Sequence, residues 1–192
     1  CYGLSLLHTH LKVGGSVVLN NTFIFIGSVI NDLKEYKCTG FSGVPSHFQI
    51  LLRKTKSFKT AHFPDLKYVT QAGGKLHTIF IKEFINSFPE VKFYVMYGQT
   101  EATARLSYLP LEMLNKKLGS IGKGIPGVEL EIFNSKNQPT KPGEVGEIVA
   151  KGDNIMIGYL NDIEDTNKTL RNGWLYTGDL AFKDEDGYFY LT

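Results

Sequence analysis

The apolar segment 91–96, Val-Lys-Phe-Tyr-Val-Met, constrains the fold of this chain more than any other stretch. Its β-branched and aromatic residues form an almost unbroken run, which predicts a strand buried on both faces. Gly98 ends the run, and the polar residues Gln99, Thr100 and Glu101 follow at once. The segment therefore predicts a strand of a parallel sheet that delivers polar side chains to the carboxyl edge of that sheet.

Thr100 and Glu101 allow two interpretations. The threonine hydroxyl can cap a following helical turn, where the free N–H groups also favour a negative charge such as Glu101. A hydroxyl and a carboxylate at the end of a parallel strand can equally hold a phosphate and its metal ion. From these two residues alone the helix cap is the simpler interpretation.

Residues 1–107 alternate short apolar runs with helical patterns, which predicts βαβ units and a parallel sheet. We expect strands at 16–19, 38–42 and 66–71, with Gly73-Gly74 ending the last of them. We expect helices at 4–11, at 31–37, from Pro45 onward and at 76–88. The last helix carries one apolar stripe, made of Leu76, Phe80, Phe84 and Phe88.

Residues 108–127 are predicted to be a connector, and residues 128–192 a β-rich, barrel-like part. The connector contains Gly-Lys-Gly-Ile-Pro-Gly at 122–127, but Pro126 and the alternating strand after it exclude a dinucleotide-binding loop. Strands are expected at 128–133 and 145–151, and Asn172-Gly173 indicates a tight hairpin. Residues 184–187 lack the length of a calcium loop and are interpreted as a charged hairpin turn. The fold class is therefore α/β followed by a β-rich part.

Composition excludes several kinds of partner. Lys and Arg number 21 against 19 acidic residues, and neither sign is concentrated, so we expect no nucleic-acid partner. No apolar run is long enough to span a membrane. Cys1 and Cys38 match no metal-binding spacing and favour a reduced, cytoplasmic setting.

Four motifs, taken in order, carry a resemblance that covers essentially the whole chain. Tyr97-Gly98-Gln99-Thr100-Glu101 resembles the Y-G-x-T-E motif of the adenylate-forming (AMP-binding) superfamily. Upstream, Gly73-Gly74-Lys75-Leu76 resembles the glycine segment that precedes that motif by one helix. Downstream, residues 146–152 with 158–161, and then residues 173–180 (Gly-Trp-Leu-Tyr-Thr-Gly-Asp-Leu), resemble two later motifs. The form of the last motif is most similar to that of acyl-CoA synthetases.

The resemblance implies a role for each matching residue. For ATP binding, it implies that Gly73, Gly74 and Lys75 lie beside the adenine, that Tyr97 packs on the adenine and that Asp179 binds the ribose hydroxyls. For catalysis, it implies that Thr100 binds the α-phosphate and that Glu101 binds Mg²⁺. Gly98 and Gln99 would lie beside the acyl-adenylate. An ionised aspartate suits the role at the ribose because it only accepts hydrogen bonds. The alternative for Asp179 is a turn residue satisfied by nearby backbone.

The resemblance also implies a reaction. A carboxylic acid is joined to AMP from ATP with Mg²⁺, pyrophosphate leaves, and the thiol of CoA then takes the acyl group. Two alternatives stay open: transfer to a carrier-protein thiol, as in a peptide-synthetase adenylation domain, and a non-catalytic nucleotide-binding module. We expect the acid to lie near 41–44, Gly73-Gly74 and Met96, which are small or apolar.

The resemblance is incomplete at both ends of the sequence. The chain begins at Cys1, and no Ser/Thr/Gly-rich phosphate loop precedes residue 71. The arginine and the C-terminal lysine domain that the family carries after the last motif do not follow. We therefore expect the chain to be part of the large N-terminal domain of a longer enzyme, and to be inactive by itself.

Overall fold

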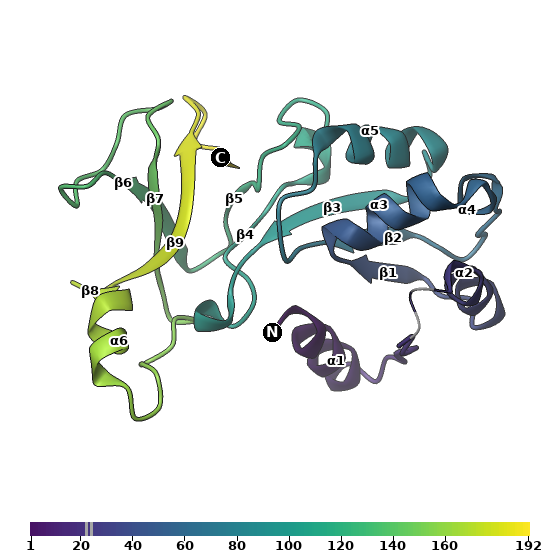
Figure 1. Ribbon diagram of the computed structural model, residues 1–192, viewed down its shortest axis with the longest axis horizontal. Helices are drawn as coiled ribbons and strands as arrows, with labels where there is room; N and C mark the ends of the chain where they lie inside the picture. Colours follow the sequence, from purple (N-terminus) through teal and green to yellow (C-terminus); the bar gives the residue numbers. More distant parts are fainter. Residues whose placement is uncertain (22, 24) are drawn as a thin grey trace. The chain divides into compact units, whose positions relative to one another are not determined.

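A computed structural model describes residues 1–192 except 22 and 24, and forms two compact units that are described separately (Figure 1). One unit comprises residues 3–94, and the other comprises residues 95–192 together with residues 1–2. The predicted fold class is confirmed: helices and parallel strands come first, and an antiparallel sheet follows.

The boundary between the units falls inside strand β3 (Lys92–Tyr97), so the predicted first part, 1–107, runs past it. The reason is local pairing, because Met96 and Tyr97 lie opposite Tyr108 and Ser107 of strand β4 (Ser107–Tyr108). The division into 1–107, 108–127 and 128–192 stays a prediction about domains.

The unit of residues 3–94 contains a parallel strand pair. Gly40 to Gly43 of β1 lie opposite Tyr68 to Gln71 of β2, and Lys92 N at the start of β3 donates to Lys67 O at 3.0 Å. The elements of this part of the chain are α1 (Tyr2–Lys12), α2 (Ile26–Glu35), β1 (Gly40–Gly43), α3 (Pro45–Lys54), α4 (Lys56–Thr60), β2 (Tyr68–Gln71) and α5 (Thr78–Ser87).

Aromatic rings fill the core of this unit. Phe48 of α3, Phe84 of α5 and Phe93 of β3 are fully buried. The ring centroids lie 5.2 Å apart for Phe48–Phe93 and for Phe84–Phe93, within the range of favourable aromatic pairs. The predicted stripe of the last helix is confirmed at Leu76, Phe84 and Phe88, which are buried, and Ile81 joins them in the core, whereas Phe80 is only half-buried.

Two of the predicted elements in this unit need correction. Residues 16–19 form no strand, although they read Ser-Val-Val-Leu. A β-branched run becomes a strand only where a neighbouring strand completes its hydrogen bonds, and here none of the described ladders includes it. The helix predicted at 31–37 exists, but it begins earlier, at Ile26, and ends at Glu35.

The other unit contains an antiparallel sheet in the order β10-β9-β7-β6, with β8 paired to β9. Its core includes the fully buried side chains Leu106, Ile132, Ile148 and Leu175. The remaining elements are the short helices η1 (Thr100–Ala102) and η2 (Leu111–Met113), strands β5 (Lys123–Gly124), β6 (Val128–Phe133) and β7 (Gly146–Gly152), helix α6 (Ile163–Thr169), and strands β8 (Leu170–Arg171), β9 (Trp174–Lys183) and β10 (Phe189–Leu191).

Local sequence predicts much of this sheet correctly. Strand β6 has the predicted bounds, and Asn172-Gly173 forms the predicted hairpin, because Arg171 lies opposite Trp174. Both turn residues have positive φ, 52° and 79°, as a type I′ turn requires. Helix α6 is an element that the sequence reading did not include. Its N-cap is Asp162, whose side chain accepts from Asp165 N.

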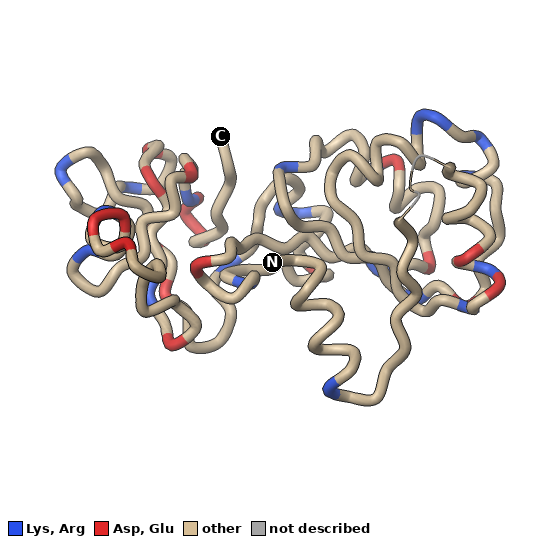
Figure 2. Tube along the Cα trace, turned by 60° about the horizontal axis from the view of Figure 1, so that its bottom comes forward, with Lys and Arg blue, Asp and Glu red and all other residues tan. Residues whose placement is uncertain are grey.

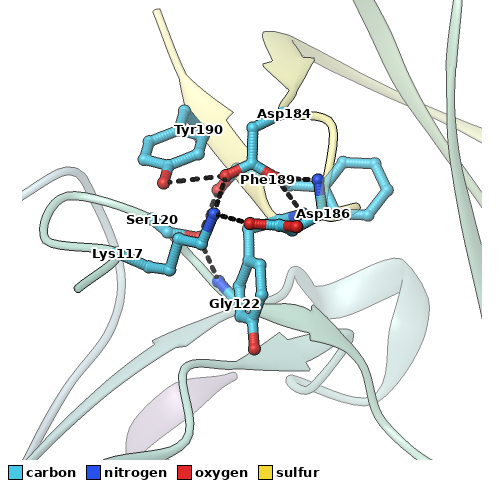
Figure 3. Close-up of polar contacts among 8 residues, drawn as sticks. Lys117, Ser120, Gly122, Asp184, Asp186, Phe189 and Tyr190 are labelled. Atoms are coloured by element: carbon cyan, nitrogen blue, oxygen red, sulfur yellow. Dashed lines mark hydrogen bonds and ion pairs between the residues drawn. The ribbon is translucent and has the colours of Figure 1, made fainter. Parts of the chain in front are cut away.

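A cluster around Lys117 fixes the hairpin between β9 and β10. Figure 3 shows the Lys117 ammonium between Asp184 and Asp186, and its Nζ lies 2.7 Å from Asp184 Oδ2. The Asp184 carboxylate also accepts from the Tyr188 N–H and the Tyr190 hydroxyl. The predicted charged hairpin turn is therefore confirmed, and its carboxylates bind a lysine of the connector.

Charges of both signs are dispersed over each unit (Figure 2). Among the helices described, none combines the length and the apolar character that crossing a membrane requires. The absence of a nucleic-acid partner stays a prediction.

Gly98 is packed too closely against a neighbouring backbone for any side chain. A Cβ at this position would lie 2.4 Å from Ala104 O and 2.8 Å from Arg105 Cα. The chain after Gly98 folds back on itself, and Leu106 N donates to Tyr97 O at 2.9 Å. Glycine is therefore required here by space.

We expect Lys117→Met to lower the free energy of unfolding near neutral pH, and the loss to shrink in acid. Burial by itself would raise the pKa of the Asp184 carboxyl, but the hydrogen bonds from Lys117 and from the Tyr188 N–H outweigh it and lower that pKa. A carboxyl with a lowered folded pKa stabilises the fold above its unfolded pKa of about 3.9, and this stability is lost as pH falls through the folded value.

Urea unfolding of both proteins between about pH 7 and about pH 2.5 measures this difference. The adjacent Lys116→Met is the control, because Lys116 is exposed and is expected to have no effect at any pH. A loss that is the same at every pH would contradict the assigned role of Asp184.

Gly98→Ala is expected to destabilise the protein by about 1–3 kcal/mol, because the added methyl group displaces the backbone at Ala104. Gly27→Ala is the matched control, since Gly27 lies in α2 with nothing within 4 Å of the added Cβ. It should leave stability unchanged or raise it by up to about 1 kcal/mol. Urea unfolding measures both, and equal effects of the two variants would contradict the space argument.

Candidate functional site

The polar turn after β3 is a single 3₁₀ turn, η1. The residue in the N-cap position is Gln99, which makes no side-chain capping bond, and Thr100 is the first residue of the turn itself, so the interpretation of Thr100 as the cap is wrong. Thr103 and Ala104 adopt positive φ, 53° and 74°, and a left-handed residue cannot continue a right-handed helix. Thr100 is left exposed at the tip of the turn, with Glu101 beside it.

A segment far along the chain holds this turn in place. Asn154 Nδ2 donates to Ala102 O at 3.1 Å and to Arg105 O at 2.9 Å. Met156 N donates to Glu101 O at 2.8 Å. Two successive non-glycine residues with positive φ cost about 1–3 kcal/mol each, and such strain persists only where surrounding contacts enforce it. The sequence reading did not find Asn154, and an asparagine after a strand is a weak signal.

Tyr159 orients the carboxylate of Glu101. Its hydroxyl donates to Glu101 Oε1 at 2.8 Å, and this hydrogen bond is the main reason why the pKa of Tyr159 is raised. Tyr159 belongs to the motif at 158–161, which sequence analysis used only for the resemblance. The contact shows that Tyr159 of that motif lies beside Glu101, the predicted metal ligand.

The donor groups near Glu101 suit one class of metal complex. Within the described residues, no three His, Cys, Asp or Glu side chains gather closely enough to hold a metal ion. Mg²⁺ is usually bound by one or two carboxylates, with phosphate oxygens and water as its other ligands. The residues present therefore fit Mg²⁺ that arrives with a nucleotide, and Glu101 is the group that would hold it.

Asp179, the predicted ribose ligand, is hydrogen-bonded to Tyr97, the residue predicted to pack on the adenine. Tyr97 lies at the end of β3, and its hydroxyl donates to Asp179 Oδ2 at 2.7 Å. Burial raises the pKa of the Tyr97 phenol above its ordinary range, so the hydroxyl stays protonated and donates. Residues 82 positions apart in the chain are thus in direct contact.

A bulge in β9 presents Asp179 to solvent. Leu180 lies opposite Glu147 and Tyr176 lies opposite Val149, so Thr177, Gly178 and Asp179 face a single residue of β7. Thr177 Oγ1 donates to Ile148 O at 2.8 Å, and Gly178 N donates to Glu147 Oε1 at 2.9 Å. Bulges of this kind re-aim side chains and are frequent beside active sites.

Gly73, Gly74 and Lys75 lie in the unit of residues 3–94, directly after β2. Both glycines have positive φ, 79° and 150°, and Gln71 Nε2 donates to Gly74 O at 2.7 Å. The predicted end of the strand before Gly73-Gly74 is confirmed, while the role of the three residues at the adenine stays a prediction. In the other unit the structure joins Tyr97 to Asp179 by a hydrogen bond, and Thr100 and Glu101 follow Tyr97 in the chain after Gly98 and Gln99.

Comparison with known proteins gives consistent results. A family model described as "AMP-binding enzyme" matches residues 1–160. The chain is 31% identical to the oxalate–CoA ligase of Arabidopsis thaliana over 98% of its own length, and 31% identical to a feruloyl-CoA synthase of Amycolatopsis, also over 98%. It matches the solved structure of o-succinylbenzoate CoA synthetase from Bacillus subtilis in complex with ATP and magnesium with a TM-score of 0.85, at 30% identity and over 98% of this chain.

The chain covers 38% of the length of each of these three proteins. The match to the family model extends over most of the chain, and it includes β3, the turn after it and Tyr159. The relatives named above are CoA ligases and synthetases. This chain belongs to the AMP-binding enzyme family.

Proposed function

We propose that this chain is part of the large N-terminal domain of an ATP-dependent acid–thiol ligase, which activates a carboxylic acid as an acyl-adenylate and transfers the acyl group to CoA. The observation that carries the proposal is the contact between Tyr97 and Asp179. Two residues from separate motifs, each expected to bind the nucleoside, form one hydrogen-bonded pair. The turn with Thr100 and Glu101 begins three residues after Tyr97.

Tyr97 and Asp179 would hold the nucleoside. The Tyr97 hydroxyl occupies Asp179 Oδ2, and a carboxylate has further lone pairs for the ribose hydroxyls. Because the hydroxyl fixes the carboxylate before the nucleotide arrives, less conformational freedom is lost on binding. The Tyr97 ring would pack on the adenine.

Thr100 and Glu101 would act at the phosphates. The exposed Thr100 hydroxyl can donate to the α-phosphate, and Glu101, oriented by Tyr159, would bind the metal. Mg²⁺, when bound, offsets the negative charge that builds up when a carboxylate approaches a triphosphate. The contribution of the protein is to fix these groups before reaction, since preorganised charges need no rearrangement in the transition state.

The proposed reaction has two steps. An oxygen of the carboxylate attacks the α-phosphorus of ATP, the bond to the β-phosphate oxygen breaks, and pyrophosphate leaves. The sulfur of the CoA thiol then attacks the acyl carbon, AMP leaves, and the thiol proton passes to the surroundings. The acids named for the relatives differ, since they include oxalate, ferulate and long-chain fatty acids. A cytoplasmic setting and a role in fatty acid metabolism are part of this proposal.

Pyrophosphate exchange by the complete protein tests the proposal, with ATP, Mg²⁺ and a panel of fatty, aromatic, dicarboxylic and amino acids. We expect exchange that requires one class of acid, and Glu101→Gln to lower it about 100-fold, because a lost metal ligand removes a few kcal/mol of transition-state stabilisation. Glu164→Gln is the control. Glu164 is exposed and pairs with Lys168 on the surface of α6.

The outcomes separate the alternatives. No exchange with any acid, together with measurable ATP binding, would favour a non-catalytic nucleotide-binding module. Exchange followed by acyl transfer to a carrier protein but not to CoA would favour a carrier-loading enzyme.

Tyr97→Phe is expected to weaken AMP binding about fivefold, the effect of losing one hydrogen bond that positions a charged group. Isothermal titration calorimetry of the complete protein measures the dissociation constant. Tyr176→Phe on strand β9 is the matched control, because its hydroxyl donates to Asn137 Oδ1 at 3.3 Å, away from the candidate site. An unchanged dissociation constant in Tyr97→Phe would contradict the assigned role of the pair.

A further inference from the structure

Arg105, directly after the turn at the candidate site, differs from the two other arginines of the chain. Arg53 pairs with Glu83 at 3.0 Å, and the Arg171 guanidinium lies 3.3 Å from the centre of the Tyr176 ring. Arg105 has no such partner in the part of the chain that the structure describes.

The Arg105 side chain is partly buried and poorly satisfied. Its Nε is buried and makes no hydrogen bond to any described residue, and its Nη1 donates to the sulfur of Met96. A thioether sulfur is a weak acceptor and carries no negative charge. Burial lowers the pKa of the guanidinium, but arginine keeps its proton in proteins. A charge that stays in place while partly removed from water is costly unless an anion accompanies it.

The position of Arg105 connects it to the site. Its Cα lies against Gly98, and its carbonyl accepts from Asn154, the side chain that also holds the turn at Ala102. Met96, which the guanidinium contacts, is the residue of β3 expected to lie beside the acid. A planar guanidinium presents paired N–H groups that match the two oxygens of a carboxylate.

We propose that Arg105 binds an oxyanion of the substrate, the distal carboxylate of a dicarboxylic acid whose other carboxylate is adenylated. This inference rests on the proposed function, and it narrows the acid to one with a second negative charge. A phosphate oxygen of ATP offers the same chemistry. We favour the acid because the guanidinium contacts Met96, whereas Thr100 and Glu101 are the residues expected at the phosphates.

Pyrophosphate exchange by the complete protein tests the proposal with dicarboxylic acids and monocarboxylic acids matched in carbon number, such as adipate with hexanoate and phthalate with 2-methylbenzoate. We expect the wild type to prefer a dicarboxylate. Arg105→Met should lower kcat/KM for that acid by about 10- to 100-fold, with little change for the matched monocarboxylate or in the KM for ATP. Arg105→Lys, which keeps the charge, should recover part of the loss.

Arg53→Met is the matched control, because it removes an arginine that already has an acidic partner. It should leave the preference between the two acids unchanged. A thermal melt accompanies each variant. Removal of an uncompensated charge should leave the melting temperature of Arg105→Met unchanged or raise it, so lost exchange would not reflect unfolding.

Three results would overturn the proposal and leave the proposed function in place. The first is a wild type that uses monocarboxylates and no dicarboxylate. The second is an Arg105→Met protein whose preference between the two acids is unaltered. The third is a rise in the KM for ATP in Arg105→Met, with both acids affected alike. The last would place a phosphate at Arg105. Exchange with no acid at all would overturn the proposed function and, with it, this inference.

Discussion

The close approach of Gly98 to the backbone of Ala104 is the constraint on which the candidate site depends. Because glycine has no side chain, the backbone of Ala104 can lie directly against Gly98, and the chain can reverse direction within a few residues of β3. The reversal places Thr100 and Glu101 at the tip of the turn and Arg105 after it, and the chain then returns to pair with Tyr97. Gly98 therefore allows the polar side chains of Thr100 and Glu101 to follow the end of β3 within a few residues.

Contacts from distant segments give this turn its shape. Asn154 and Met156 bond to its carbonyl groups, and Tyr159 bonds to the carboxylate of Glu101. The bulge in β9 brings Asp179 to the hydroxyl of the buried Tyr97. The antiparallel sheet thus supports the groups expected to bind the nucleoside and the phosphates, and it supplies one of them.

Local sequence was a good guide to those elements whose formation depends on neighbouring residues. The alternation in β6 and the Asn172-Gly173 turn each appeared as predicted, because side-chain alternation and positive φ are local properties. The strand expected at 16–19 did not form, since a strand depends on a partner that its own sequence does not specify. Helix α6 was absent from the sequence reading because its short polar segment buries no residue.

By itself the sequence determined the family, the mixed fold and the residue types available for chemistry, because motifs and hydrophobic periodicity depend only on which residues follow one another along the chain. Only the tertiary structure decided that Tyr97 donates to Asp179, that Tyr159 orients Glu101 and that Asn154 holds the turn. The partners in each contact are separated by dozens of residues. Neither periodicity nor local propensity carries information about which distant groups meet, since packing of the sheet and the bulge in β9 set those distances.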